Sequence, residues 1–159
     1  MDKQPFWTLT QVTKTGNKLP RLENIDLNIF PGITAIVGAS GAGKSTLLNL
    51  LTGFEKPDQG TLRSKIDPNG FTLPLYWVPQ DEGLWPQLTV KEHLLAIGKT
   101  AEEEMNQLLD QLEMTDKINC SPETLSMGER SRLSIARAIY YNPAVLVMDE
   151  PLVNIDPAR

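Results

Sequence analysis

The amino-acid sequence predicts an α/β fold with a mostly parallel sheet, antiparallel strands at the N-terminus and an inserted helical subdomain. The first observation is a β-rich run at 33–38 that ends in glycine and leads through a glycine-rich loop into a leucine-rich helix. The second is a continuous apolar run at 144–148, typical of a strand buried on both faces of a parallel sheet. A strand followed by a loop and a helix is the opening unit of such a sheet.

The N-terminal strands are predicted from two earlier runs, at 6–12 and 22–30. Apolar residues in the second run approximate the alternation of a half-buried strand, and turn residues at 16–17 lie between the two runs. A Pro-Gly pair at 31–32 ends the second strand. The helix after the glycine-rich loop is expected to be mostly buried and to stop near Gly53. Its apolar residues are Leu47, Leu48, Leu50, Leu51 and Phe54.

A helical subdomain is predicted over 81–135, inserted into an α/β core made of 1–80 and 136–159. Two pairs in this stretch, Thr89 with Glu92 and Thr100 with Glu103, have capping-box spacing and predict the starts of two helices. The second helix has one apolar stripe at helical spacing, consisting of Met105, Leu108, Leu109 and Leu112.

Composition limits the possible function classes. Fifteen basic and twenty acidic side chains leave a net charge of −5 without a basic stripe, so no direct contact with nucleic acid is expected. A single cysteine, Cys120, excludes an internal disulfide and favours a reducing compartment. The sequence also lacks an apolar run long enough to span a bilayer and a signal peptide's basic start.

The segment GASGAGKST, residues 38–46, matches a phosphate-binding loop in the required strand-to-helix context. Its glycines allow backbone N–H groups to approach phosphate oxygens, and the following helix directs its positive end at the same anion. Lys44 is predicted to reach the β- and γ-phosphates and Ser45 to offer its hydroxyl to Mg²⁺. The alternative is a glycine-rich turn that only caps a helix. The predicted nucleotide contacts are Gly38, Ala39, Ser40, Gly41, Ala42, Gly43, Lys44, Ser45 and Thr46.

Two acids end the apolar run at 144–148. Asp149 is placed to hold Mg²⁺ at the carboxyl end of a buried strand, and Glu150 to polarise an attacking water as a general base. The alternative interpretation is a pair of acids at the point where a strand meets solvent.

A second small, polar loop lies at 124–130, TLSMGER. Ser126 can donate a hydroxyl, Gly128 allows close backbone approach, and the helix start adds its dipole toward an anion. Ser126 and Glu129 also have capping-box spacing, so the segment is equally a well-capped helix. Both interpretations can hold together, because a phosphate site needs a rigid helix end.

Four segments in chain order, GASGAGKST, WVPQDEGLWPQLTV, LSMGER and AVLVMDEP, resemble the nucleotide-binding domain of the ABC ATPases over essentially the whole chain. The resemblance implies a P-loop NTPase core that binds ATP and Mg²⁺. It also implies a head-to-tail pair with a second ABC ATPase domain, in which Ser126, Gly128 and Glu129 face the nucleotide held by the partner. Met127 replaces the family's usual first glycine, and by resemblance Gln80 touches Mg²⁺ or water.

The resemblance further implies an ATP-hydrolysing subunit that powers an integral-membrane permease from the cytoplasmic side, peripheral on the inner face of the cell membrane. The segment at 83–94 is similar to the family's contact with the permease. There, Leu84 and Trp85 are either an exposed apolar contact or ordinary core. Two alternatives remain: a soluble ABC ATPase outside transport, and a truncated cassette that binds ATP with little hydrolysis.

Three departures from the family pattern are predicted to matter. Thr15 stands where the family stacks an aromatic ring on adenine, and Val153 replaces a small polar residue, although Asp156 is in place. The chain ends at Arg159, before the family's switch histidine, which predicts a C-terminally truncated cassette with impaired hydrolysis. His93 precedes the signature loop and is expected to be a surface or partly packed residue.

Overall fold

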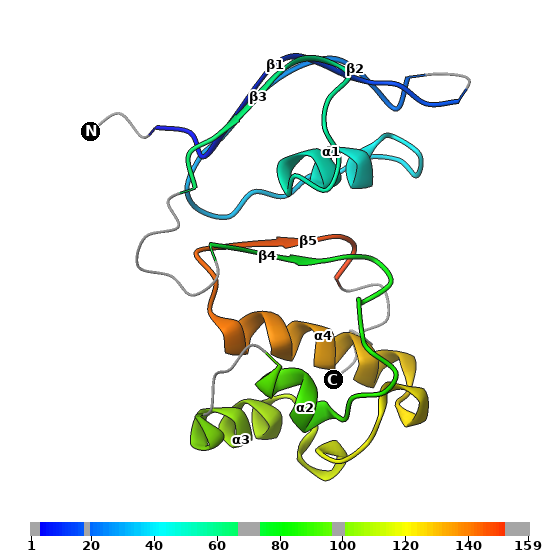
Figure 1. The fold of residues 1–159 in the computed structure, drawn as a ribbon, viewed down its shortest axis with the longest axis vertical. Coiled ribbons are helices and arrows are strands. Elements are labelled where there is room, and N and C mark those ends of the chain that lie inside the picture. Colours follow the sequence, from blue (N-terminus) through cyan, green and yellow to red (C-terminus); the bar gives the residue numbers. More distant parts are fainter. Residues whose placement is uncertain (1–3, 18–19, 67–73, 97–100, 152–159) are drawn as a thin grey trace. The chain divides into compact units, whose positions relative to one another are not determined.

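The structure is a computed structural model that describes residues 4–17, 20–66, 74–96 and 101–151. The chain divides into two compact units, 1–67 and 68–159. The first contains antiparallel strands and one helix, and the second a parallel strand pair with helices (Figure 1). The predicted α/β class, with antiparallel strands at the N-terminus, is therefore confirmed. The division into 1–80 with 136–159 and 81–135 stays a prediction.

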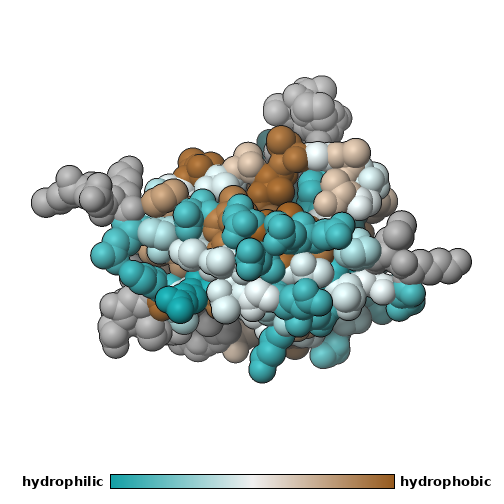
Figure 2. Space-filling model, turned by 90° about the horizontal axis from the view of Figure 1, so that it is seen from above, coloured by the Kyte–Doolittle hydropathy of each residue, from teal (hydrophilic) through white to brown (hydrophobic). Residues whose placement is uncertain are grey.

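The first unit is built on a three-stranded antiparallel sheet in the order β2-β1-β3. The strands are β1 (Trp7–Lys14), β2 (Leu22–Ile29) and β3 (Gln59–Ser64). Both predicted N-terminal strands are present, and β3 had no clear sequence signal, because five of its six residues are exposed. Alternation along β1 buries Trp7 and Leu9 and turns Thr10 outward. The face seen in Figure 2 carries many hydrophilic side chains together with a distinct hydrophobic patch.

Helix α1 (Lys44–Leu51) lies along one face of this sheet (Figure 1). The indole nitrogen of Trp7 donates to the carbonyl oxygen of Leu51 at 3.0 Å, which ties the end of α1 to β1. The predicted stop near Gly53 is confirmed, because Gly53 has a left-handed φ of 77° just after the helix. The buried residues of α1 are Thr46, Leu47, Leu48, Leu50 and Leu51.

The predicted strand at 33–38 is wrong. Residues 33–39 have no regular secondary structure, and the side chains of Ile33 and Val37 are 104% and 87% exposed. A β-rich sequence favours an extended backbone, but a strand also needs a neighbour that pairs with its N–H and C=O groups. Among the described residues, no strand pairs with this segment.

The second unit contains β4 (Leu75–Val78) and β5 (Val145–Met148), which pair in parallel. Val78 lies opposite Met148, so both carboxyl ends reach the same edge. Helices lie on one side of this pair (Figure 1). They are α2 (Val90–Leu95), α3 (Glu102–Gln111) and α4 (Met127–Tyr141), with short 3₁₀ turns at Thr115–Lys117 and Pro122–Thr124.

The helices of the second unit share one apolar core. The apolar stripe of α3 is confirmed, with Leu112 partly buried at its C-terminal end. Burial of the α4 face excludes water from the space between the helices, which is the main favourable term in their packing. The fully buried members of this core, each 0 or 1% exposed, are Val90, Leu94, Met105, Leu109, Met114, Leu133 and Ala136.

Of the capping boxes predicted at Thr89 and at Thr100, the first is present. The Thr89 backbone N–H donates to the Glu92 carboxylate at 2.7 Å, and the Glu92 N–H donates to the Thr89 hydroxyl at 3.3 Å. The other differs: Thr100 lies outside the described residues, and α3 is capped by Ala101 without a side-chain hydrogen bond. Three glutamates at 102–104 place negative charge at the positive end of the α3 dipole. This charge–dipole interaction stabilises the helix start in place of a side-chain cap.

Candidate functional site

The glycine-rich loop at 38–46 bends tightly onto the start of α1. Gly43 caps the helix with φ 90°, a left-handed conformation that favours glycine. A Cβ atom on Gly43 would lie 2.5 Å from the carbonyl oxygen of Arg21 and 2.8 Å from a methyl group of Leu22. Gly43 is therefore required both by its φ and by the close approach of β2.

Lys44 is the charged group of this loop. Its ammonium donates to the carbonyl oxygens of Gly38 and Ala39, each at 3.0 Å. The first backbone N–H groups of α1 have no partner within the helix, and they add to the positive end of its dipole. A lysine ammonium held over a loop at a helix start fits a polyphosphate. Ser45, in the first turn of α1, is on the same helix end.

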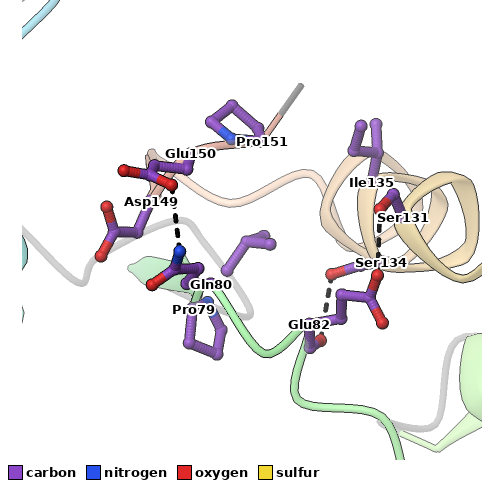
Figure 3. A pocket seen from close by; sticks show the side chains of 10 residues that line it. Pro79, Gln80, Glu82, Ser131, Ser134, Ile135, Asp149, Glu150 and Pro151 are labelled. Atoms are coloured by element: carbon purple, nitrogen blue, oxygen red, sulfur yellow. Dashed lines mark hydrogen bonds between the residues drawn. The ribbon is translucent and has the colours of Figure 1, made fainter. Parts of the chain in front are cut away.

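The second group of predicted residues lies at the carboxyl ends of β4 and β5 (Figure 3). The Gln80 side-chain amide donates to the Glu150 carboxylate at 3.0 Å. The Asp149 N–H donates to the Val78 carbonyl at 3.0 Å and extends the parallel ladder by one residue. Asp149 is 6% exposed, whereas Glu150 is exposed and has a left-handed φ of 50°. The structure thus brings together the amide and the two acids.

A cavity of about 230 Å³ opens beside these strand ends and α4 (Figure 3). Carboxylate and amide oxygens are ligands that Mg²⁺ accepts, usually together with several waters. The residues at this site therefore fit a magnesium ion with its water shell. The cavity is lined by Val78, Pro79, Gln80, Glu82, Ser131, Ser134, Ile135, Asp149, Glu150 and Pro151.

The loop before α4 forms the predicted capping box. The Ser126 N–H donates to the Glu129 carboxylate at 2.7 Å, and the Glu129 N–H donates to the Ser126 hydroxyl at 3.3 Å. The hydrogen bond from the Ser126 backbone holds the pKa of Glu129 below its usual range, with a smaller effect of Lys117 nearby. Gly128 lies in the first turn of α4, and Met127 is 65% exposed at its start.

Sequence reasoning missed a set of contacts between the loop after β4 and α4. The Glu82 carboxylate accepts from Nε of Arg130 at 3.0 Å and from the Ser131 hydroxyl at 2.9 Å. The Ser134 hydroxyl donates to the Glu82 carbonyl oxygen at 3.0 Å. The partners are 48 to 52 residues apart, so no local spacing in the sequence relates them.

His93 corrects another expectation: it is fully buried, with 0% exposure. Its Nε2 accepts from the Trp85 N–H at 2.9 Å, and its Nδ1 lies 2.8 Å from the Thr89 carbonyl oxygen. This pair of partners assigns a neutral ring with the proton on Nδ1. Burial lowers the pKa of His93, which agrees with a neutral ring. Because both ring nitrogens are satisfied, burial is compatible with this polar side chain.

Trp85 is both packed and partly exposed, whereas its sequence position left open whether it is an exposed apolar contact or an ordinary core residue. Its ring stacks on His93 with centroids 5.6 Å apart, and the Arg137 guanidinium lies 4.4 Å from the ring centre. Trp85 is nevertheless 40% exposed. Leu84 is partly buried against the helical core. Trp85 therefore offers a rigidly held, partly exposed aromatic surface, while Leu84 is a packing residue.

Thr15, which stands where the ABC ATPases have an aromatic ring, is hydrogen-bonded to Asp58. The Thr15 N–H donates to Asp58 at 2.8 Å, and its hydroxyl donates to the same carboxylate oxygen. These hydrogen bonds, with a further one from Lys14, hold the pKa of Asp58 far below its usual range. Val153 and Asp156 lie outside the described residues. Within the described parts of the chain, none of the helices is both long and apolar enough to cross a membrane.

Known proteins resemble this chain in both sequence and fold. The sequence matches the ABC transporter family over residues 22–153. It is 38% identical over 151 residues to the aliphatic sulfonates import ATP-binding protein SsuB of Burkholderia ambifaria, covering 94% of this chain and 47% of that protein. The corresponding protein of Burkholderia pseudomallei is 37% identical over 150 residues, covering 93% and 46%. The chain thus spans about half the length of the curated relatives it matches.

A solved structure shows the same fold. The ATP-binding cassette MJ0796, in a dimeric post-hydrolysis state bound to ADP and Pi, aligns with a TM-score of 0.77 and 31% identity, covering 95% of this chain and 76% of that one. The antiparallel strands, the parallel pair and the helical core described above are therefore parts of an ABC ATPase cassette fold. The family match covers most of the chain, from Leu22 to Val153. This chain belongs to the ABC transporter family, as an ATP-binding domain.

Proposed function

We propose that this chain is the ATP-hydrolysing subunit of an ABC membrane transporter and that it acts as a head-to-tail pair. The observation that carries the proposal is the Gln80–Glu150 hydrogen bond beside buried Asp149, at the shared carboxyl edge of two parallel strands. If the two acids only ended a strand at the surface, nothing would require one carboxylate to be buried and the other to be hydrogen-bonded to an amide. A site that binds a hydrated cation and an attacking water uses the buried carboxylate and the amide together.

The phosphate-binding loop supplies the nucleotide contacts in this proposal. On binding, Lys44 exchanges the carbonyl oxygens of Gly38 and Ala39 for phosphate oxygens, and the amides of the loop and of the α1 start take the remaining charge. The proposed ligands of Mg²⁺ are Ser45, Gln80 and Asp149, and the ion would supply charge neutralisation at the β- and γ-phosphates. The exposed Glu150 carboxylate then accepts a proton from the attacking water.

The α4 start contacts the nucleotide of the second copy in this proposal. Ser126 and Gly128 are at the helix end, where backbone N–H groups and the dipole favour an anion. The capping box holds this end in one conformation before any nucleotide arrives. A γ-phosphate gripped from both sides joins two copies only until it is hydrolysed. Hydrolysis then releases the pair, which is the movement that a transporter can use.

The permease is the further partner that we infer, and it places this subunit at the cytoplasmic face of a membrane. Trp85 supports the proposal, because a ring held by His93 and Arg137 keeps its exposed part in a fixed orientation. The relatives are named as import proteins, which favours import. The solute would be bound by the permease, so the sulfonates in those names are not assigned to this chain.

A second candidate is a cassette that binds ATP with little hydrolysis. Thr15 favours it, because both of its donors are bound to Asp58 and it has no ring to stack on a base. Loss of base stacking weakens the hold on the nucleotide, and hydrolysis requires that the nucleotide stay in one geometry.

The deciding experiment is sedimentation of Glu150→Gln with Mg²⁺ and ATP, recording both protein size and nucleotide absorbance. The variant keeps an acceptor for Gln80 but lacks the proposed base, so a pair with trapped ATP is expected. ATP that travels with a monomer would favour the binding-only cassette. ATP that travels with neither species, at concentrations where the Lys44→Ala control behaves identically, would contradict both candidates.

A further inference from the structure

The loop after β4 is attached to α4 by a group of side chains centred on Glu82, of which Glu82, Ser131 and Ser134 are seen in Figure 3. We call Glu82, Arg130, Ser131 and Ser134 the Glu82 clamp. Two of its members hold the Glu82 carboxylate, at 3.0 Å and 2.9 Å, and the third holds the carbonyl oxygen of the same residue at 3.0 Å. One residue is therefore gripped through both its side chain and its backbone.

The next residue of the loop is held by the same helix. The Arg137 guanidinium donates to the Gly83 carbonyl oxygen at 2.8 Å. The four α4 residues at 130, 131, 134 and 137 recur at helical spacing and therefore share one face. A single stripe of α4 thus fixes two successive residues of the loop.

The backbone of Glu82 is in a conformation that side chains rarely adopt. Its φ is 66° and that of Gly83 is 57°, so two left-handed residues follow each other. A non-glycine residue stays in this region only when its surroundings hold it there, and such residues cluster at functional sites. The Glu82 N–H also donates to the Pro79 carbonyl at 3.0 Å, which closes the turn that begins beside Gln80.

The carboxylate of the clamp is well protected from water. The Glu82 side chain is 12% exposed, although that of Arg130 is 41% exposed. An exposed ion pair contributes little, because solvent screens it and both side chains lose freedom. Here the carboxylate accepts two hydrogen bonds, one from a cation, and charge-assisted bonds of this kind are the strong ones. The clamp is thus more than an ion pair on the surface.

We propose that Glu82 is a positioning residue that makes Gln80 and the α4 start at Ser126 move as one body. Gln80 is two residues before Glu82, and Arg130 is one helical turn after Ser126, so the clamp is the short path between the two ends. A displacement at Ser126 passes along the rigid helix to Glu82 and from there to the Gln80–Glu150 contact. The inference rests on the proposed ATPase function, and it adds Glu82, Arg130 and Ser131 to the residues on which turnover depends.

The chain offers a matched control for this proposal. Glu113 also has a left-handed φ, of 53°, and also pairs with an arginine of α4, Arg132, at 3.5 Å. Its side chain is 68% exposed, and its position at the end of α3 is remote in sequence from Gln80. Glu113→Ala therefore removes a similar pair from the same helix without touching the clamp.

The experiment compares Glu82→Ala, Glu82→Gln and Glu113→Ala in ATP turnover and ATP affinity. Glu82→Ala should lower kcat by about ten- to a hundredfold, because a small misplacement of a catalytic group is costly. KM for ATP should stay within about twofold, since the phosphate-binding loop belongs to the other unit. Glu82→Gln keeps one of the two acceptor oxygens, which can accept from Arg130 or from Ser131, so it should recover part of kcat. Glu113→Ala should leave kcat unchanged.

Hydrogen exchange of the same variants separates this inference from the proposed function. Amides at 82–85 should exchange faster in Glu82→Ala than in the unaltered chain, with no change in Glu113→Ala. Unchanged exchange, or unchanged kcat, in Glu82→Ala would overturn the inference, as would an equal loss in Glu113→Ala. If the unaltered chain hydrolyses no ATP, the ATPase proposal fails and hydrogen exchange alone decides the clamp.

Discussion

The backbone N–H of Trp85 donates to Nε2 of the fully buried His93 at 2.9 Å. This hydrogen bond requires a neutral imidazole, because a protonated ring has no acceptor at Nε2. The loop that follows β4 is thus attached to α2 by an imidazole whose pKa is lowered from its usual 6.5 in the folded chain. Charged groups around the ring act in opposite directions: Arg137 on α4 lowers the pKa of His93, and Glu92 on α2 raises it, but burial is the largest effect.

Stability should therefore depend on pH through His93. Its folded pKa is lowered from the usual 6.5, so below about pH 6.5 the unfolded chain binds a proton that the folded chain does not. Unfolding becomes easier as pH falls from 6.5 toward the folded pKa, and the loss then levels off. Urea unfolding at pH 7.5 and pH 5.5 should show lower stability at the lower pH.

His93→Gln serves as the control for this dependence. The variant is expected to be less stable at both pH values, since it alters a buried, hydrogen-bonded position. What it should lose is the difference between pH 7.5 and pH 5.5. The pKa values of Glu92 and Glu129 are lowered from 4.5, so these two groups change the stability mainly below pH 4.5. They contribute little to the difference in stability between pH 7.5 and pH 5.5. An equal pH dependence in both proteins would show that His93 is not the group responsible.

Lys44→Ala should weaken ATP binding by about a hundredfold or more, because it removes the positive charge that would pair with the phosphates. The thermal midpoint should hardly change, since the hydrogen bonds of Lys44 to Gly38 and Ala39 are exposed to solvent. Calorimetric titration measures the affinity. Lys65→Ala is the matched control, because Lys65 is an exposed lysine of the same unit that donates to Gln4. Unchanged affinity in Lys44→Ala would refute the assignment of the phosphate-binding loop.

Ser126→Arg should keep ATP binding by a single copy but prevent ATP-dependent pairing. The substitution places a large side chain at the exposed start of α4, where the nucleotide of the second copy would lie. It also removes the cap of α4, worth about 1 kcal/mol. Ser126→Ala removes the same cap without the bulk, so it separates the two effects. Sedimentation with and without ATP measures pairing. Equal loss of binding and pairing in Ser126→Arg would mean that the helix has misfolded.

Thr15 should make this chain indifferent to the base of the nucleotide. Because its N–H and hydroxyl are both bound to Asp58, most of the affinity is expected to come from the phosphates. ATP and GTP should bind within about threefold of each other, because a threonine offers the base no ring to stack on. Thr15→Tyr should raise the affinity for ATP but not for tripolyphosphate. Thr61→Tyr, on an exposed position of β3, is the control. A strong preference for ATP in the unaltered chain would contradict the idea.

Features that depend on neighbours three or four residues apart could be predicted from the sequence. The capping boxes at Thr89 and Ser126 are set by a hydroxyl and a glutamate one helical turn apart. The buried face of α3 follows from apolar residues at helical spacing. The phosphate-binding loop is similarly local, since its glycines, its lysine and the start of α1 are consecutive.

Tertiary structure alone decided the features that join distant residues. Gln80 and Glu150 are 70 residues apart, and Glu82 and Arg130 are 48 apart, so only the pairing of β4 with β5 and the packing of α4 bring them together. His93 was misjudged because burial depends on which elements cover a helix face. The run at 33–38 failed as a strand for a related reason: its residues set the backbone preference, but a strand exists only with a hydrogen-bonded neighbour.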